Sequence, residues 1–204
     1  MLVLLTPTPV PAATLAPERL IAGLAQPAPA RTAFAEVRYV GVLERPLILH
    51  GDLIWQGGER LERDVSAPYR ETTTISGDQV RIVRPGQPPQ TFDLGRAPEL
   101  KGLLTGFRAL LSGDAALLRA TFAVSASGDA RAWTLELKPR DAALARRLAG
   151  ISVDGSGHRL RCLRMDQSNG DTSFTLLGAL AATALPAAPT PAALATLCAG
   201  GPAS

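Results

Sequence analysis

Residues that commonly carry out acid–base or nucleophilic chemistry are sparse in this sequence. The histidines are His50 and His158, and each lies in a run of residues typical of a β-strand. A single histidine in such a run is more often a satisfied surface or core residue than a catalyst. A hydrolase also needs a nucleophile and an oriented base, but there is no G-x-S-x-G elbow, and Gly155-Ser156-Gly157 is typical of a turn. The sequence therefore predicts a protein that is not an enzyme and has no catalytic residue.

Carboxylates stand mainly where they support turns. Asp52, Asp78, Asp93 and Asp129 lie mostly beside turn residues, where aspartate caps backbone groups. No G-x-G-x-x-G motif or phosphate loop opens a helix, and we expect no cofactor. An enzyme, or an accessory subunit of one, would need the histidines and some carboxylates to converge in one cleft, and the sequence leaves this alternative open.

The cysteines, Cys162 and Cys198, lack the paired C-x-x-C spacing of a zinc site. With so few histidines besides, four ligands for a tetrahedral site are hard to assemble, and we expect no metal. In an exported protein the cysteines can form a disulfide that closes a long loop and stabilises the fold by about 3–4 kcal/mol. The alternative is two separate buried thiols, because the pairing depends on the compartment.

Composition argues against several classes of protein. Aromatic residues make up only 4% of the chain although 46% is apolar, and a protein that stacks nucleic-acid bases usually has more rings, so we expect no nucleic-acid partner. The net charge of +3 arises from 21 basic and 18 acidic residues without long runs of one sign. This favours an ordinary solvated surface over a dedicated basic patch, although it is compatible with anionic lipids. No stretch of about 18 uninterrupted apolar residues occurs, and none is expected to span a membrane.

The chain divides into an N-terminal arm, one domain and a tail. Residues 1–15 begin MLVLLTPTPVPAA, which looks like the end of a secretory signal but lacks a basic n-region. The segment is therefore either a signal remnant or a disordered arm, and export is the favoured alternative. Residues 16–184 are long enough for one domain, and residues 185–204 form a Pro/Ala-rich tail with a short helix around Cys198.

The first half of the domain begins with a helix and continues as strands. Residues 16–25 place Pro17 at a first helical position and align Leu20, Ile21 and Leu24 in one stripe. From residue 32 to residue 94, Gly, Pro, Asp and Ser separate short runs that predict an antiparallel meander: FAEVRYVGVL, LILHGDLIW, YRETTTI, QVRIV and QTFDL.

A strong helical stripe follows in residues 98–111. Its apolar members recur at helical spacing: Leu100, Leu103, Leu104, Phe107, Leu110 and Leu111. On the pattern alone this stripe indicates core packing more readily than ligand contact. Gly102 and Gly106 interrupt it at a cost of about 1 kcal/mol each, so the helix needs either close packing or looseness at these positions.

The second half returns to strands. A short helix is expected at 114–119, strands at 121–124 and 130–138, and a helix at 140–149 capped by Asp141. The runs GISV, HRLRCLRM and TSFTLLGAL then form three strands, joined at residues 154–157 and at the Asn169-Gly170 hairpin turn. The fold class is therefore mainly β with helices (α+β), a curved antiparallel sheet with helices packed on one face.

The order and spacing of several motifs resemble a known family. Gly51-Asp52-Leu53-Ile54-Trp55 is followed by Ala67-Pro68-Tyr69 and by the turn in ISGDQV at residues 75–80. Later come WTLELKP at 133–139, a helical stretch at 144–148, and strands near 157–165 and 172–176. Across residues 16–180 this arrangement resembles the outer-membrane lipoprotein carrier protein (LolA) family.

The resemblance implies an incomplete β-barrel covered by helices, in the periplasm. It implies a periplasmic, monomeric carrier that shuttles lipid, fatty-acyl or lipoprotein acyl chains from an inner-membrane donor to an outer-membrane acceptor. A carrier must hide these chains because exposing each CH₂ to water costs about 0.8 kcal/mol. The expected ligand-binding residues are Leu53, Trp55, Leu61, Tyr69, Leu100, Leu103, Leu104, Phe107, Leu111, Trp133 and Leu135. On the sequence alone, the two tryptophans are more often core residues.

One departure from the family pattern bears on the cargo. Members of the family have an Arg-Pro pair after the first motif, whose arginine latches the helical lid. Residues 56–60 here read QGGER, and only Arg60 or Arg63 can substitute. This favours a divergent relative that carries another lipid or an acylated product. The alternative is a non-catalytic periplasmic binding or sensor module that docks a protein partner, with its cavity filled by its own side chains and an exposed apolar patch.

Overall fold

The computed structural model describes residues 15–201, apart from the side chains of residues 98–100. Most of the expected signal remnant or arm, and the side chain of Leu100, therefore lie outside the described residues. The strands are β1 (Ala30–Tyr39), β2 (Leu47–Gly57), β3 (Arg60–Ala67), β4 (Glu71–Ser76), β5 (Gln79–Val83), β6 (Gln90–Asp93), β7 (Phe122–Gly128), β8 (Trp133–Pro139), β9 (Leu148–Ser156), β10 (Arg159–Gln167) and β11 (Thr172–Leu177). The helices are α1 (Pro17–Gly23), α2 (Pro98–Ser112), α3 (Ala115–Thr121), α4 (Ala142–Ala145) and α5 (Pro191–Cys198), with 3₁₀ turns η1 (Leu94–Arg96) and η2 (Gly178–Ala182).

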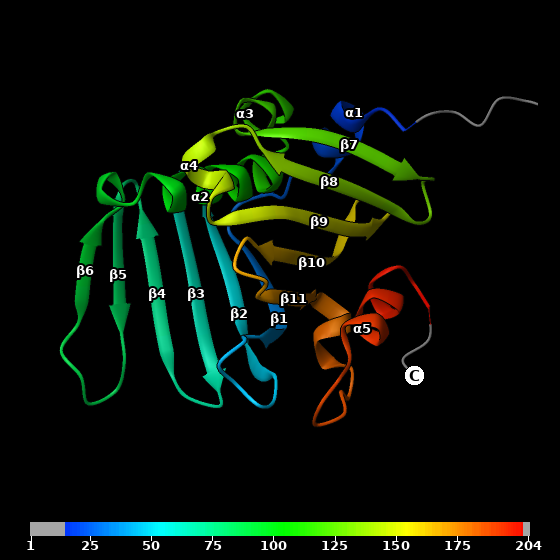
Figure 1. The fold of residues 1–204 in the computed structure, drawn as a ribbon. Coiled ribbons are helices and arrows are strands. Elements are labelled where there is room, and N and C mark those ends of the chain that lie inside the picture. Colours follow the sequence, from blue (N-terminus) through cyan, green and yellow to red (C-terminus); the bar gives the residue numbers. More distant parts are fainter. Residues whose placement is uncertain (1–14, 202–204) are drawn as a thin grey trace, which may run out of the picture.

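Within this range the strands form one antiparallel sheet of 11 strands. Hairpins build β1 to β6 and β7 to β11, and the two halves meet where β1 pairs with β11, with Phe34 opposite Leu177. The edges of the sheet are β6 and β7, so it curves without closing on itself (Figure 1). The predicted curved antiparallel sheet is confirmed.

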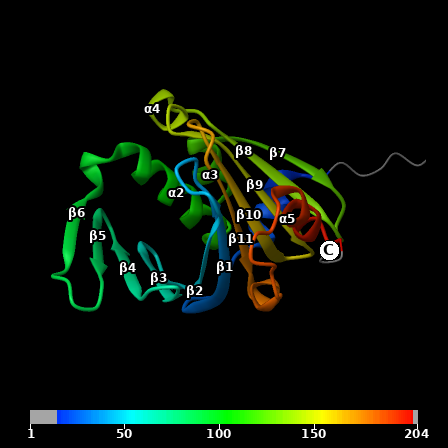
Figure 2. The ribbon, with the colours of Figure 1, turned by 60° about the horizontal axis from the view of Figure 1, so that its bottom comes forward.

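Side chains alternate between two faces of this sheet. We call the face that carries Glu36, Leu53 and Leu135 the inner face and the opposite one the outer face. On the inner face, α1 to α4 cover β7–β10 in a core that includes Ile21 and Leu118, both 0% exposed. Figure 2 shows the sheet bent around α2, with α5 on the far side of β10 and β11.

The C-terminal helix packs on the outer face, which corrects the expectation of helices on one face. Leu194 and Leu197 of α5 join Val37 and Phe174 in a second core. The physical reason is that the outer face of β1, β10 and β11 carries apolar side chains, including Val37, Phe174 and Leu176, which need cover from water. The sulfur atoms of Cys162 and Cys198 are bonded, which fastens the tail to β10. The hydroxyl of Tyr39 adds a hydrogen bond to the Pro189 carbonyl at 2.6 Å.

Aspartate side chains cap the first turns of two short helices. The carboxylate of Asp114 accepts from the Leu117 N–H at 2.9 Å, and that of Asp141 accepts from the Leu144 N–H at 2.8 Å. Gly113 ends α2 in the left-handed conformation, with φ of 70°. No helix in the described part of the chain is long and apolar enough to cross a membrane.

Two elements differ from the sequence-based expectations. The helix expected at 140–149 covers only Ala142–Ala145, because Leu148 already pairs with Gln167 in the sheet. The strand β3 was not among the expected runs, since its charged residues point to both faces and hide the alternation. It forms because β2 and β4 flank it and pair along its length, for example Trp55 with Leu61 and Leu61 with Ile75.

Candidate functional site

Helix α2 lies across the ends of β2–β5 and is tethered there by ion pairs. Arg108 contacts Glu59 in the β2–β3 turn at 2.8 Å, and Lys101 contacts Asp78 in the β4–β5 turn at 2.8 Å. Both pairs are partly exposed, and such pairs contribute about 0–1 kcal/mol each. The other side of α2 packs firmly in the core on α3 and α4, where Ala109 and Leu110 are buried. One side of α2 is therefore anchored and the other is held lightly.

The lightly held side of α2 carries apolar residues outside the cores. Leu104, Phe107 and Leu111 follow i, i+3 and i+7 spacing and share one side of the helix. All three are only half-buried, and none belongs to the two cores described above or to a third cluster of the described residues at the centre of the inner face, formed by Phe34, Leu49, Val65 and Leu177. This side is next to Arg108, whose partner Glu59 lies at the end of β2, so it faces the β2–β5 half of the sheet.

The sheet offers matching apolar residues on its inner face. Trp55, Leu61 and Ile75 lie opposite one another on β2, β3 and β4, and none belongs to a core cluster of the described residues. We call these three, together with the three α2 residues, the inner apolar surface. Apolar walls with a few polar groups are characteristic of ligand sites.

One polar group on this surface has no partner. The indole Nε1–H of Trp55 is buried and makes no hydrogen bond within the described residues, although the residue is only 9% exposed. An unsatisfied buried donor costs about 1–3 kcal/mol. An acceptor oxygen on a bound molecule would remove this cost, whereas the indole of Trp133 is already satisfied by the Gly157 carbonyl at 2.9 Å.

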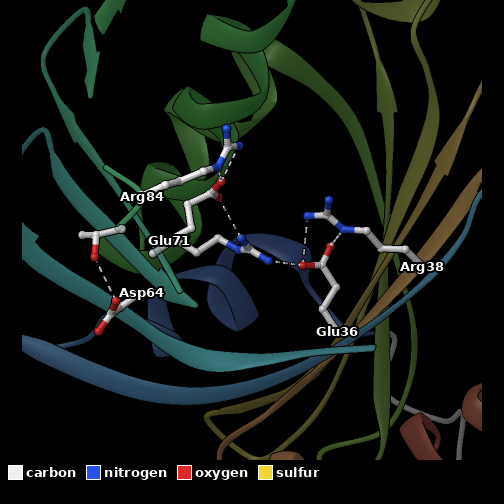
Figure 3. A network of polar contacts seen from close by, with 7 residues as sticks. Glu36, Arg38, Asp64, Glu71 and Arg84 are labelled. Carbon is white, nitrogen blue, oxygen red and sulfur yellow. Dashed lines mark hydrogen bonds and ion pairs between the residues drawn. The ribbon is translucent and has the colours of Figure 1, made fainter. Parts of the chain in front are cut away.

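A network of charges occupies the inner face near the opposite ends of these strands (Figure 3). Glu36 on β1 accepts from Arg38 at 2.7 Å and from Arg63 at 2.5 Å. Glu71 on β4 accepts from Arg84 at 2.6 Å and lies 3.9 Å from Arg63. Arg63 therefore bridges two buried glutamates, and the three guanidinium groups exceed the two carboxylates by one positive charge.

A ring contact and a buried ion pair fix the arginines of this network. The guanidinium of Arg63 lies over the Phe34 ring, 4.8 Å from its centroid, which adds a cation–π attraction. Burial lowers the pKa of Arg38, but its hydrogen bond and ion pair with Glu36 outweigh this and raise that pKa above its ordinary value. The contacts of Arg38 and Arg63 therefore hold two guanidinium groups at defined positions on the inner face.

An open depression of about 620 Å³ adjoins the network. It is lined by Tyr69 and Arg70 from the β3–β4 turn and by Arg84, Pro85 and Gln87 from the end of β5 and the following turn. Arg84 belongs both to the depression and to the network, so the depression borders the network at this side chain. Arg70 is exposed and has no ion-pair partner among the residues the structure describes.

Comparison with known proteins assigns this fold to a family. The model of a family described as outer membrane lipoprotein carrier protein LolA-like matches residues 9–201. The chain belongs to this LolA-like family. A search of curated proteins gave no match.

Solved structures that match this LolA-like chain share little sequence with it. A LolA superfamily protein from Nitrosomonas europaea is 10% identical, with a TM-score of 0.46 over 86% of this chain and 96% of that one. LprF from Mycobacterium bovis is 12% identical, with a TM-score of 0.35 over 88% of this chain and 99% of that one. MucB in the MucA/MucB complex of Pseudomonas aeruginosa is 14% identical, with a TM-score of 0.37 over 86% and 58%.

The residues expected to bind ligand fall into three places in this LolA-like fold. Leu53, Trp55 and Leu61 lie on the inner face of β2 and β3, and Tyr69 lies in the exposed wall of the depression. Leu103, Leu104, Phe107 and Leu111 lie on α2, where Leu103 packs against the helical core. Trp133 and Leu135 lie beneath the helices, 2% and 0% exposed. These ligand-binding assignments remain predictions.

The residues that could support other chemistry stand on separate elements. His50 is exposed on the outer face of β2, and His158 is exposed in the β9–β10 turn beside Gly23 of α1. Among the described residues no group of three or more His, Cys, Asp or Glu is arranged to hold a metal ion. The histidines are therefore not brought together in one cleft of the described residues.

The charge network and the tether of α2 were not recognised in the sequence. Arg63 was considered only as a substitute latch, yet its partners are Glu36 and Glu71 on neighbouring strands. Arg60 is exposed at the start of β3. The tether instead joins Arg108 of the helix to Glu59, within the QGGER stretch that lacks the Arg-Pro pair. The sequence did contain one signal of the network: Glu36 and Arg38 stand at alternate positions of β1 and therefore share the face of Phe34.

Proposed function

We propose that this LolA-like protein is an exported carrier that binds a lipid or acylated molecule against the inner apolar surface. The observation that carries the proposal is the buried, unpaired Trp55 indole N–H among apolar side chains that join none of the cores. An acyl chain would cover Leu104, Phe107 and Leu61, and an ester or amide carbonyl would accept from Trp55. Family membership supports the same conclusion.

The tether of α2 suits loading and release. Because exposed ion pairs contribute only about 0–1 kcal/mol each, separating α2 from the β2–β3 turn costs little compared with disrupting its core side. The disulfide supports an oxidising compartment such as the periplasm. We propose that the donor and acceptor of the cargo are membranes or membrane-bound proteins on either side of that compartment.

The test uses a fluorescent fatty-acid probe and a matched pair of variants. Leu61→Gln places an amide on the inner face of β3, and Ile54→Gln makes the same change at a half-buried position on the outer face of β2. We expect Leu61→Gln to weaken probe binding about tenfold, as the loss of 1–2 kcal/mol of apolar contact implies, and Ile54→Gln to bind as the wild type does. Equal binding by all three proteins, or no binding by any of them, would refute the proposal.

A protein-docking module is the second candidate. It is favoured by exposed apolar residues at the β1–β2 turn, where Val42 is 89% and Leu43 is 47% exposed. Inside the sheet, Phe34, Leu49 and Val65 fill the centre of the inner face with the protein's own side chains. Under this alternative the purified protein contains no acyl species, which mass spectrometry of organic extracts detects directly.

A further inference from the structure

We infer that the depression beside the charge network binds the anionic headgroup of an amphiphile whose acyl chain runs along the inner face of β4 and β5. This inference rests on the proposed function and specifies the class of cargo, a single molecule with a phosphate-type head. The juxtaposition that carries it is a cationic hollow at one end of an apolar strip. The unpaired Trp55 indole lies at the other end.

The excess of positive charge at the hollow is built into the structure. Glu36 and Glu71 neutralise two of the three network arginines, and Arg70 adds a further cation without a carboxylate partner among the described residues. An anion bound in the depression would therefore meet about two uncompensated positive charges. Charge complementarity of this kind selects anionic ligands and weakens with added salt.

The donors of the hollow suit an oxyanion. Arg84 directs Nε and one terminal nitrogen to a single oxygen of Glu71, and its guanidinium has five N–H donors, so others remain for a ligand. Its side chain is 40% exposed, which leaves that edge accessible. Arg70 and the amide of Gln87 line the same hollow. Guanidinium groups match phosphate and carboxylate oxygens in pairs, which makes arginine the usual residue for such groups.

An apolar strip leads inward from the hollow. Moving along β4 from Glu71, the next inner-face positions are Thr73 and Ile75, which pair with Ile82 and Val80 of β5. At about 3.3 Å per residue, Glu71 to Ile75 spans roughly 13 Å. Ile75 is already part of the inner apolar surface, so a chain attached to a head at Arg84 passes Thr73 and Ile82 and reaches that surface at Ile75.

The chemistry favours a lipid over an acidic peptide. An acidic peptide needs cations along its length, whereas here the cations gather at one end and the strip beyond them is apolar or hydroxyl-bearing. Tyr69 and Pro85 also provide apolar walls beside the cations, as expected where a headgroup joins a hydrocarbon chain. An acidic protein segment is therefore the outcome that the test must be able to reveal.

The test measures affinity for three amphiphiles with one acyl chain in common, a phosphate monoester, its zwitterionic choline ester and a neutral monoacylglycerol. Arg70→Gln removes a cation that has no partner, so the network stays intact. Arg81→Gln is the matched control, because Arg81 is exposed on the outer face of the same hairpin. We expect the wild type and Arg81→Gln to prefer the phosphate monoester about tenfold, and Arg70→Gln to lose most of that preference.

Each result separates this inference from the proposed function. Equal affinity of the wild type for charged and neutral amphiphiles overturns the headgroup site and leaves the carrier proposal standing. Absence of binding to all three overturns both. If Arg81→Gln loses as much preference for the phosphate monoester as Arg70→Gln does, the preference arises from the overall positive charge of the protein, and the headgroup site is overturned. Displacement of the amphiphile by an acidic peptide without an acyl chain, or by inorganic phosphate at equal concentration, overturns the lipid assignment.

Discussion

Breaking the disulfide should lower stability without affecting the proposed binding surface. Cys162 and Cys198 are separated by 36 residues and are 0% and 1% exposed. Closing a loop of this length removes entropy from the unfolded chain worth about 4 kcal/mol at 25 °C on the chain-entropy model. The bond joins β10 to α5 on the outer face, whereas the inner apolar surface lies on the other side of the sheet.

The perturbation is made in two ways that check each other. Reduction of the wild-type protein removes only the cross-link, and the double variant Cys162→Ala with Cys198→Ala also removes the sulfur atoms. In urea unfolding followed by circular dichroism, we expect both to lose about 4 kcal/mol. That loss corresponds to a midpoint lower by roughly 2 M at an m-value of about 2 kcal/mol/M. Affinity for the fatty-acid probe should stay at the wild-type value under native conditions.

Two results would count against this reasoning. A reduced protein within about 1 kcal/mol of the oxidised one would mean that residual contacts already confine this loop in the unfolded chain. Loss of probe binding in a reduced protein that is still folded would mean that the outer and inner faces are coupled. Binding would then depend on the tail.

Two further predictions concern α2. Gly106→Ala should destabilise the protein by about 1–2 kcal/mol in thermal unfolding, because a Cβ there overlaps the buried Phe122 ring and this overpacking outweighs the gain in helix propensity. Gly102→Ala is the control, since a Cβ at that position has ordinary room, and it should be neutral or stabilising. The same loss of stability at both positions would refute close packing as the reason for the glycines. Arg108→Gln should change stability by less than about 1 kcal/mol but accelerate probe release in stopped-flow displacement; adding Glu59→Gln should change the rate no further, and an additive effect would show that the two residues do not act as a pair.

Local features of the structure were largely predictable from the sequence. The alternation of Trp133, Leu135 and Leu137 reproduces the inward face of β8. Asp114 and Asp141 cap the helices that follow them. Each of these depends on neighbours within a few residues, where propensity, periodicity and capping act directly.

The candidate site was less predictable, because its parts come from distant segments. The polar stretch of β3 becomes a strand only because it pairs with β2 and β4. Arg63 finds its ion-pair partners, Glu36 and Glu71, only when the sheet brings β1 and β4 close to it. Likewise, the sequence of α2 predicts one broad apolar stripe. The structure divides that stripe into a side buried on α3 and α4, and a second side that joins no core among the described residues.

The sequence by itself determined most of the strands and helices other than β3, the mainly β class, the scarcity of histidine and cysteine, and the resemblance to the LolA-like family. Tertiary structure alone decided three things: the pairing of β1 with β11 across about 140 residues, the placement of α5 on the outer face, and the gathering of arginines at one end of the inner face. The physical reason is that strand pairing satisfies backbone hydrogen bonds that carry no side-chain signature. Which charged residues become neighbours is therefore set only when the whole sheet has formed.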